Sequence, residues 1–271
     1  MNKIGLISGD GKLPLHIGNS LIKHNFDVTY LLLHSVKDKS IYKNENHINI
    51  NILSIKKIIK ILNLNNINEV IFAGSIKRPS IKDLGFDIDT LKLAKKLLLE
   101  KQGDNNLLTS IKKIFENQGI SFFNWIKYCP NLFATERNLS INKPSNSAKY
   151  NLIKAKSIIS EFKKIDVGQS IIIQNQLVLG LEAIEGTDHL IERCSNYKRK
   201  GDKGILVKFS KKNQSQLIDI PTIGLKTIEN LKKNNYEGVF VEKNKCLIID
   251  KDEVSNYANN NNIFISSVEL D

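Results

Sequence analysis

Residues 1–14, MNKIGLISGDGKLP, place an apolar strand directly before a glycine turn and the start of a helix. The strand, residues 4–8, is too continuously apolar to have one face in water, which is typical of strands buried on both faces of a sheet. Residues 1 to about 130 then repeat the alternation of strand and helix. This rhythm predicts an α/β protein whose amino-terminal domain is a parallel sheet covered by helices on both faces.

The remaining elements follow from apolar periodicity and turn residues. In the first half we predict strands at residues 4–8, 28–33, 69–74 and 120–123, and helices at residues 14–24, 54–62, 90–101 and 105–118. In the second half we predict helices at residues 148–164, from residue 187, at 223–233 and just before a last strand near Phe264. We predict further strands at 169–174, 177–183 and 204–209, and a second hairpin that pairs 238–242 with 246–250.

The second half differs from the first because it contains antiparallel pairs. Asn175-Gln176 is a tight turn between two strands, which predicts a hairpin. A stretch rich in Asn, Ser, Lys and Pro precedes this half and is typical of a connection. We therefore predict domains at residues 1–131 and 148–271, joined by a linker at 132–147, with the second an α/β domain containing antiparallel hairpins.

The amino-acid composition limits the class of protein to which the chain can belong. The chain has 271 residues, of which 41% are hydrophobic and 25% charged, as in globular proteins. No apolar run approaches the roughly 20 residues that span a bilayer, and the amino terminus lacks a secretion signal. The three cysteines, Cys129, Cys194 and Cys246, form no CxxC pair, which argues for reduced thiols and against a zinc site. We expect a cytoplasmic protein.

The formal net charge of +12 raises the question of a polyanionic partner. Nucleic-acid binding needs basic residues gathered on one face with aromatic platforms, whereas the lysines here are spread along most predicted helices. We therefore expect no nucleic-acid partner. Attraction towards anionic lipid headgroups or a polyanionic substrate stays open.

Two glycine turns are the candidate phosphate contacts. Residues 9–14, GDGKLP, lie between a strand and a helix, where backbone N–H groups can approach a phosphate, and Lys12 is placed to contact it. Gly74 and Ser75 end another strand of the same sheet, so they are expected on the same rim as Gly11. The turn is a poor match to a dinucleotide fingerprint, since Pro14 replaces its third glycine. A plain tight turn is the alternative interpretation.

The acidic candidates lie in the second half. Asp219 precedes Pro221 in DIPTIG, residues 219–224, where a helix capped by Thr222 would face its carboxylate. Glu182, Glu185 and Asp188 belong to EAIEGTD, residues 182–188. Magnesium takes one or two carboxylates together with waters and phosphate oxygens, so this spacing permits a site without requiring one. The alternatives are a turn at Asp219 and a helix start capped by Thr187.

The ordered set of motifs resembles the UDP-2,3-diacylglucosamine pyrophosphatase family of lipid A biosynthesis, the metal-dependent type. The set spans nearly the whole chain and comprises GLISGDGKLP at residues 5–14, FAGS at 72–75 with Arg78-Pro79, QGD at 102–104, DVGQ at 166–169, EAIEGTD at 182–188 and DIPTIG at 219–224. The chain departs from the family at one position, because Asp10 stands where the family has a glycine. Its side chain either crowds the ligand or points away from it.

The resemblance implies a Rossmann-like amino-terminal domain, a distinct second domain and an enzyme that hydrolyses UDP-2,3-diacylglucosamine to UMP and 2,3-diacylglucosamine 1-phosphate. It makes Asp219 the catalytic residue and implies magnesium as the cofactor. The resemblance does not assign the metal ligands, for which Asp219, Asp188 and Glu185 are the candidates in this sequence. The positions that match substrate contacts, or lie on the same ligand path, are Gly11, Gly74, Ser75, Phe122 and Thr187.

The partners expected from this resemblance are a lipid-linked nucleotide-sugar substrate and, peripherally, the inner face of the inner membrane. A homodimer is left open. The alternative function is non-catalytic binding of a nucleotide sugar or an anionic lipid through the same glycine turns. Magnesium-dependent release of UMP separates the two.

Overall fold

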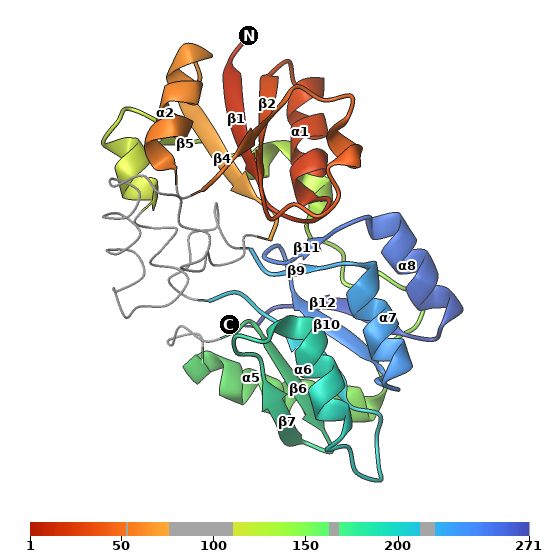
Figure 1. Ribbon diagram of the computed structural model, residues 1–271. Helices are drawn as coiled ribbons and strands as arrows, with labels where there is room; N and C mark the ends of the chain where they lie inside the picture. The colour runs from red at the N-terminus through yellow and green to blue at the C-terminus, as the bar shows by residue number, and fades with distance from the viewer. Residues whose placement is uncertain (53, 76–110, 163–167, 212–219, 271) are drawn as a thin grey trace. The chain divides into compact units, whose positions relative to one another are not determined.

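The structure is a computed structural model that describes residues 1–52, 54–75, 111–162, 168–211 and 220–270. The chain divides into two compact units, the first ending at Pro130 and the second beginning at Asn131. Figure 1 labels the helices and strands of both units. Among the helices of the described residues, none has the length and apolar character needed to cross a membrane.

The first unit is built on a parallel five-stranded sheet with the order β3-β2-β1-β4-β5. The strands are β1 Lys3–Ser8, β2 Asp27–Leu33, β3 His47–Ile50, β4 Glu69–Ala73 and β5 Ser121–Phe122. This order is that of a Rossmann fold up to its fifth strand, because the chain moves outward from β1 to β3 and then crosses back to β4. The prediction of a Rossmann-like parallel sheet is confirmed.

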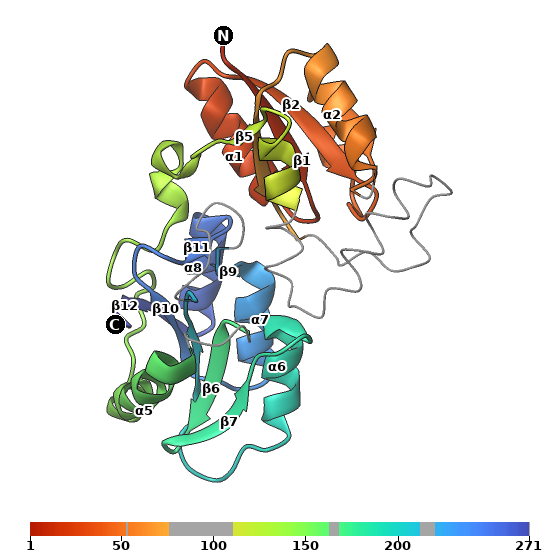
Figure 2. The ribbon, with the colours of Figure 1, turned by 90° about the vertical axis from the view of Figure 1, so that its left-hand side faces the viewer.

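Helices cover both faces of this sheet. α1 (Leu13–Lys23) and α2 (Ile55–Leu64) lie on opposite sides of the sheet in Figure 2, and residues 111–116 are also helical. Short 3₁₀ turns occupy Ser40–Tyr42, Ile126–Tyr128 and Pro130–Leu132. Ser54 takes the N-cap position of α2, but its hydroxyl makes no capping hydrogen bond. The helix predicted at residues 90–101, and the start of that at 105–118, lie outside the described residues.

The second unit has a mixed five-stranded sheet with the order β12-β10-β8-β6-β7 and a separate two-stranded sheet of β9 and β11. The strands are β6 Ser170–Gln174, β7 Leu177–Leu181, β8 Ile205–Lys208, β9 Thr222–Ile223, β10 Gly238–Glu242, β11 Leu247–Ile248 and β12 Phe264–Val268. The helices are α5 Asn146–Phe162, α6 Gly186–Ser195, α7 Leu225–Lys233 and α8 Lys251–Asn260. β8, β10 and β12 run parallel, whereas β6 is antiparallel to β7 and β8.

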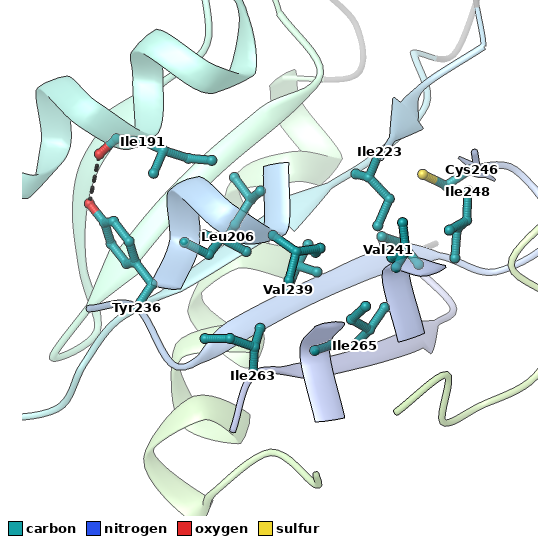
Figure 3. Packing of buried hydrophobic residues seen from close by; sticks show 14 of the residues in the cluster. Ile191, Leu206, Ile223, Tyr236, Val239, Val241, Cys246, Ile248, Ile263 and Ile265 are labelled. Atoms are coloured by element: carbon teal, nitrogen blue, oxygen red, sulfur yellow. Dashed lines mark hydrogen bonds between the residues drawn. The ribbon is translucent and has the colours of Figure 1, made fainter. Parts of the chain in front are cut away.

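Both faces of the second sheet carry a hydrophobic core, because the strand residues alternate between them. α5 covers one face, against side chains that include Ile171, Val207 and Phe240. The other face packs Leu206 and Val239 against α6, α7 and α8, as Figure 3 shows. In the same core the buried Tyr236 hydroxyl donates a 3.3 Å hydrogen bond to the Ile191 carbonyl of α6, so its polar group is satisfied.

One of the two predicted hairpins is present. β6 and β7 pair antiparallel through Asn175 and Gln176, whose φ angles of 50° and 59° are those of a tight type I′ turn. The second predicted hairpin is wrong. β10 pairs only with the parallel strands β8 and β12, while β11 pairs with β9. Lys243 N–H still donates to Val268 of β12, but Asn244 N–H donates to Ala134 and Cys246 N–H to Glu242, so the chain turns out of the sheet after Lys243.

Residues 131–145, most of the predicted linker, contact the second sheet and its neighbours. Ala134 N–H donates to the Cys246 carbonyl and Leu139 N–H to the Ile265 carbonyl, both at 2.9 Å. Ser145 binds the Glu237 carboxylate through its N–H at 2.7 Å and its hydroxyl at 2.9 Å. This segment is therefore held within the second unit, and its role as a linker at residues 132–147 stays a prediction.

Candidate functional site

The two glycine turns of the first unit meet at the carboxyl end of its sheet. Asp10 and Ser75 exchange backbone hydrogen bonds of 2.9 and 2.8 Å, which fastens the turn after β1 to the turn after β4. The approach is too close for side chains, since a Cβ on Gly9 would lie 2.5 Å from the Ser75 carbonyl oxygen and one on Gly74 would lie 2.8 Å from the Gly9 oxygen. The structure thus places Gly74 and Ser75 beside the Gly11 turn.

Gly11 has a different reason to be glycine. Its φ of 97° lies in the region that disfavours side chains, yet a Cβ there would meet no atom within 4 Å. Backbone conformation, not crowding, therefore selects glycine at this position. Lys12 follows as the exposed N-cap residue of α1. A turn with open space next to its backbone, at a helix start, is suited to a phosphate.

The contacts of Asp10, which stands where the family has a glycine, show which way its side chain points. Its Oδ1 accepts a 3.1 Å hydrogen bond from the backbone N–H of Lys37, and its Oδ2 lies 3.7 Å from the Lys37 ammonium. Lys37 follows β2, so the carboxylate is directed along the sheet towards the neighbouring strand. Asp10 joins a third loop to the two glycine turns.

Phe122 lies in β5 of the same unit and belongs to an aromatic stack. Its ring centroid is 5.4 Å from that of Phe72 at an interplanar angle of 22°, and 6.4 Å from that of Phe115. The Lys112 ammonium lies 5.7 Å from the Phe122 ring centroid. Packing alone accounts for this residue, and a substrate contact at Phe122 stays a prediction.

The second unit gathers charge where β8 ends, β6 begins and α6 starts. Lys208 at the end of β8 is paired in register with Ser170 of β6, and its side chain is only 7% exposed. The Lys208 ammonium donates to the Thr187 hydroxyl of α6 at 2.5 Å and lies 3.7 Å from a Glu182 carboxylate oxygen. We call Ser170, Glu182, Thr187 and Lys208 the Lys208 network.

The Glu182 carboxylate holds several parts of this network together. Its Oε1 accepts a 3.1 Å hydrogen bond from the Thr187 hydroxyl, and its Oε2 accepts one of 3.2 Å from the Gln169 N–H. Its backbone pairs with residues 168 and 170, and a Cβ on Gly168 would lie 2.3 Å from the Glu182 carbonyl oxygen. Glu182 is thus a fixed, largely buried anion.

Thr187 is not the helix cap that its position in the sequence suggests. α6 begins at Gly186 with Glu185 as the N-cap residue, and no side chain caps the helix. The Thr187 hydroxyl turns instead to the buried lysine and glutamate. Thr222 departs from prediction in the same way, because Gly224 is the N-cap residue of α7 and the Thr222 hydroxyl donates to the Ile220 carbonyl at 2.9 Å.

Glu185 and Asp188, the candidate metal ligands in this part, are each paired with a cation. Burial raises the pKa of the Glu185 carboxyl, but hydrogen bonds from Arg193 at 2.7 Å and from the Ala183 N–H outweigh it, so this pKa lies below its ordinary value. Both Glu185 oxygens are therefore occupied. Asp188 pairs at 2.8 Å with Lys226, whose side chain is 77% exposed. Because an exposed ion pair is weak, a metal ion could replace Lys226 more easily than Arg193, and Asp188 is the better candidate ligand than Glu185.

Asp219 lies outside the described residues, but the chain immediately after it is anchored. The Pro221 carbonyl accepts a 2.8 Å hydrogen bond from Leu247, and β9 pairs with β11. Across the described parts of the chain, no three His, Cys, Asp or Glu side chains form a group that could hold a metal ion. Magnesium usually takes only one or two carboxylates together with waters and phosphate oxygens, so a magnesium site here stays a prediction.

Two buried charges were missed in the sequence. Besides Lys208, Glu242 at the end of β10 is 1% exposed and accepts hydrogen bonds from the Ser210 N–H at 2.7 Å, the Ser210 hydroxyl at 2.8 Å and the Lys245 ammonium at 2.9 Å. In the sequence, both residues could have been recognised as the single charged residue at the end of an otherwise apolar strand, as in ILVK and GVFVE. A buried charge needs partners, so such a position indicates an organised polar site.

The fold and these features define a class: a two-unit α/β protein with a Rossmann-like unit bearing two joined glycine turns, followed by a mixed-sheet unit with a buried ionic network. Family models match both halves, the LpxI N-terminal domain over residues 3–132 and the LpxI C-terminal domain over residues 135–266. The chain belongs to the LpxI family.

A curated relative matches the chain from end to end. It is a Caulobacter vibrioides protein named UDP-2,3-diacylglucosamine pyrophosphatase LpxI, 27% identical over 276 residues, which cover 99% of this chain and 98% of the relative. The similarity therefore includes both units. The family expected from the sequence motifs is confirmed.

Proposed function

We propose that this protein hydrolyses UDP-2,3-diacylglucosamine to UMP and 2,3-diacylglucosamine 1-phosphate, a step of lipid A biosynthesis. The observation that carries the proposal is membership of the LpxI family over both halves of the chain, together with a full-length relative of that name. Non-catalytic binding of a nucleotide sugar or anionic lipid has no comparable support.

Chemically, a water oxygen attacks one phosphorus of the diphosphate, and the bond from that phosphorus to the bridging oxygen breaks. The water's proton goes to a base or to solvent, and each product keeps one phosphate. The turn at Gly11 would offer backbone N–H groups to phosphate oxygens at the start of α1, with the side chains of Lys12 and Ser75 as adjacent contacts and Gly74 allowing the close approach of the second turn. These contacts lower the cost of bringing phosphate charge into the protein.

The catalytic assignment goes to Asp219, on its match to the family's essential aspartate. Its carboxylate would orient or deprotonate the water, and the β9–β11 pairing would hold the backbone that follows it. Magnesium is the proposed cofactor, with Asp219 and Asp188 as its protein ligands, and when bound it would neutralise phosphate charge. Glu185 is a weaker choice because Arg193 and Ala183 occupy its oxygens.

Three further proposals concern location and partners. A substrate with two acyl chains resides in a membrane, so we propose that the protein acts from the cytoplasm at the inner face of the inner membrane as a peripheral protein. The excess of 40 Lys and Arg over 28 Asp and Glu favours an anionic surface. A homodimer is compatible with this account, and sedimentation at several protein concentrations tests it.

The experiment is incubation of the purified protein with UDP-2,3-diacylglucosamine and magnesium, followed by mass spectrometry. We expect UMP and 2,3-diacylglucosamine 1-phosphate in equal amounts. Excess chelator should stop their formation and added magnesium should restore it. Substrate that stays intact while bound to the protein would favour the binding-protein alternative, and full activity in chelator would remove magnesium from the account.

A further inference from the structure

We propose that one end of the second unit docks on an anionic lipid bilayer through a basic surface made of residues 149–154, 175–178 and 197–203. These segments lie in the first half of α5, at the tip of the β6–β7 hairpin and in the loop between α6 and β8. The hairpin and the loop lie at the same end of the unit in Figures 1 and 2. The inference names the surface that meets the membrane, and its biological meaning rests on the proposed function.

Hydrogen bonds hold the three segments of the basic surface together. Gln176 N–H donates to Asn151 Oδ1 at 2.7 Å, which joins the hairpin to α5. Asn175 N–H donates to Asp202 Oδ2 at 2.9 Å, and the Asn151 amide donates to the same oxygen at 3.1 Å, which joins both segments to the loop. The backbone of the surface is therefore ordered before any partner binds, and less ordering entropy is lost on docking.

Large apolar side chains are exposed on all three segments. Five of them are each between 40% and 65% exposed: Tyr150, Ile153, Leu177, Val178 and Tyr197. Tyr150 and Ile153 are three residues apart on α5, so they share one helix face. A gathered set of exposed apolar side chains marks an interaction surface. Tyrosine adds an apolar ring with a polar tip, which suits the boundary between a membrane and water.

The basic surface also carries a strong excess of positive charge. Its segments contain six Lys and Arg residues and a single acid, Asp202. The Asp202 carboxylate is turned to the protein, because Oδ2 accepts from Asn151 and Asn175 and Oδ1 accepts from the Gly204 N–H at 2.7 Å. One of the cations, Lys198, donates to backbone carbonyls at 3.0 and 2.6 Å. The other five are exposed: Lys149, Lys154, Arg199, Lys200 and Lys203.

An anionic bilayer is the partner that matches both properties of the surface. Its headgroups attract the cations, and the region beneath them takes up exposed apolar side chains. A nucleic acid would use the cations but leave the aliphatic Ile153, Leu177 and Val178 in water. A second copy of the chain, paired through this surface about a two-fold axis, would bring like charges together.

The test is cosedimentation with vesicles made of equal parts of phosphatidylglycerol and phosphatidylethanolamine, compared with vesicles of phosphatidylcholine alone. Arg199→Gln/Lys200→Gln/Lys203→Gln should weaken binding to the anionic vesicles about fivefold per charge removed, on the order of 10²-fold in total. Arg199 and Lys200 contact the hairpin through their backbones, so this variant should fold. The wild type should bind the phosphatidylcholine vesicles far more weakly than the anionic ones.

A second variant removes apolar area without changing charge. Ile153→Gln/Leu177→Thr should weaken binding to the anionic vesicles about tenfold. This loss should persist in high salt, which screens the attraction between charges. The matched control, Lys57→Gln/Lys60→Gln/Lys113→Gln, removes the same charge from exposed positions of the first unit and should bind as the wild type does.

Three results would overturn the proposal: no binding of the wild type to anionic vesicles, full binding by either surface variant, or an equal loss in the control. Without vesicle binding, self-association that Ile153→Gln/Leu177→Thr abolishes would assign the surface to a second copy. Oligonucleotide binding that the charge variant abolishes would then assign it to a nucleic acid. Either result would also overturn the proposal.

Hydrolysis of UDP-2,3-diacylglucosamine in detergent micelles separates this inference from the proposed function. β8 runs from the 197–203 loop to Lys208, so the basic surface and the Lys208 network lie at opposite ends of that strand. Both surface variants should therefore keep the wild-type rate in micelles, and a loss there as large as the loss of vesicle binding would overturn the docking role. If the wild type hydrolyses nothing but vesicle binding depends on the surface, the proposed function fails and the docking role stands.

Discussion

Replacing Gly74 with alanine tests the claim that the two glycine turns are fastened together. The new Cβ would lie 2.8 Å from the Gly9 oxygen and 2.9 Å from the Asp10 oxygen, and both are backbone atoms that cannot move alone. The φ of 85° adds the left-handed penalty of about 1–2 kcal/mol for a side chain. Overpacking typically adds about 1–3 kcal/mol, so we expect a total loss of about 3 kcal/mol.

Gly119→Ala supplies the control, because Gly119 has a similar φ of 74° in the same unit but no atom within 4 Å of an added Cβ. It should show the conformational penalty alone, about 1 kcal/mol. The assay is urea denaturation of both variants and the wild type at equal protein concentration, with KM measured on each. Gly74→Ala should also raise KM, while Gly119→Ala should not. Equal losses of stability in the two variants would refute the close approach of the turns.

Two more predictions concern titratable groups. Arg193 holds the pKa of the Glu185 carboxyl below its ordinary value of 4.5, so the stability that this pair contributes is present above about pH 4.5 and is lost as the pH falls through the folded pKa. Arg193→Met should therefore make the free energy of unfolding depend less on pH in denaturation measured from pH 6 to 3. An unchanged pH dependence in this variant would contradict the pairing. Burial raises the pKa of the Cys246 thiol to about 12 and also raises those of Cys129 and Cys194. Native protein at pH 8 should therefore resist iodoacetamide at all three, whereas rapid alkylation seen by mass spectrometry would show that they are accessible.

Local patterns predicted the parts of the fold that depend on neighbouring residues. The apolar strands β1, β2 and β4 and the turn at Asn175 and Gln176 were all visible as periodicity or turn chemistry. The β9–β11 pair could not be found in this way. Each of its strands has two residues, and the partners are brought together from distant parts of the chain. Too few residues alternate to make a pattern.

The candidate site was predictable to a similar degree. The glycines at 11 and 74 were recognisable because turns after parallel strands need them. The role of the Thr187 hydroxyl was not, since capping by the nearest helix is the local expectation, and tertiary contact with Lys208 overrides it. The buried charges of Lys208 and Glu242 follow from partners remote in sequence, although their place at the end of apolar strands marked them as unusual.

Turnover and substrate capture by Asp219→Ala, measured beside the wild type, test the central claim most directly. The variant should be folded, with an unchanged thermal midpoint, and should bind UDP-2,3-diacylglucosamine with magnesium while its turnover falls on the order of 10²-fold or more, as when a general acid or base is removed. Mass spectrometry should then find intact substrate on the variant and UMP with 2,3-diacylglucosamine 1-phosphate from the wild type. A folded variant that releases both products within a few-fold of the wild-type rate would contradict the account.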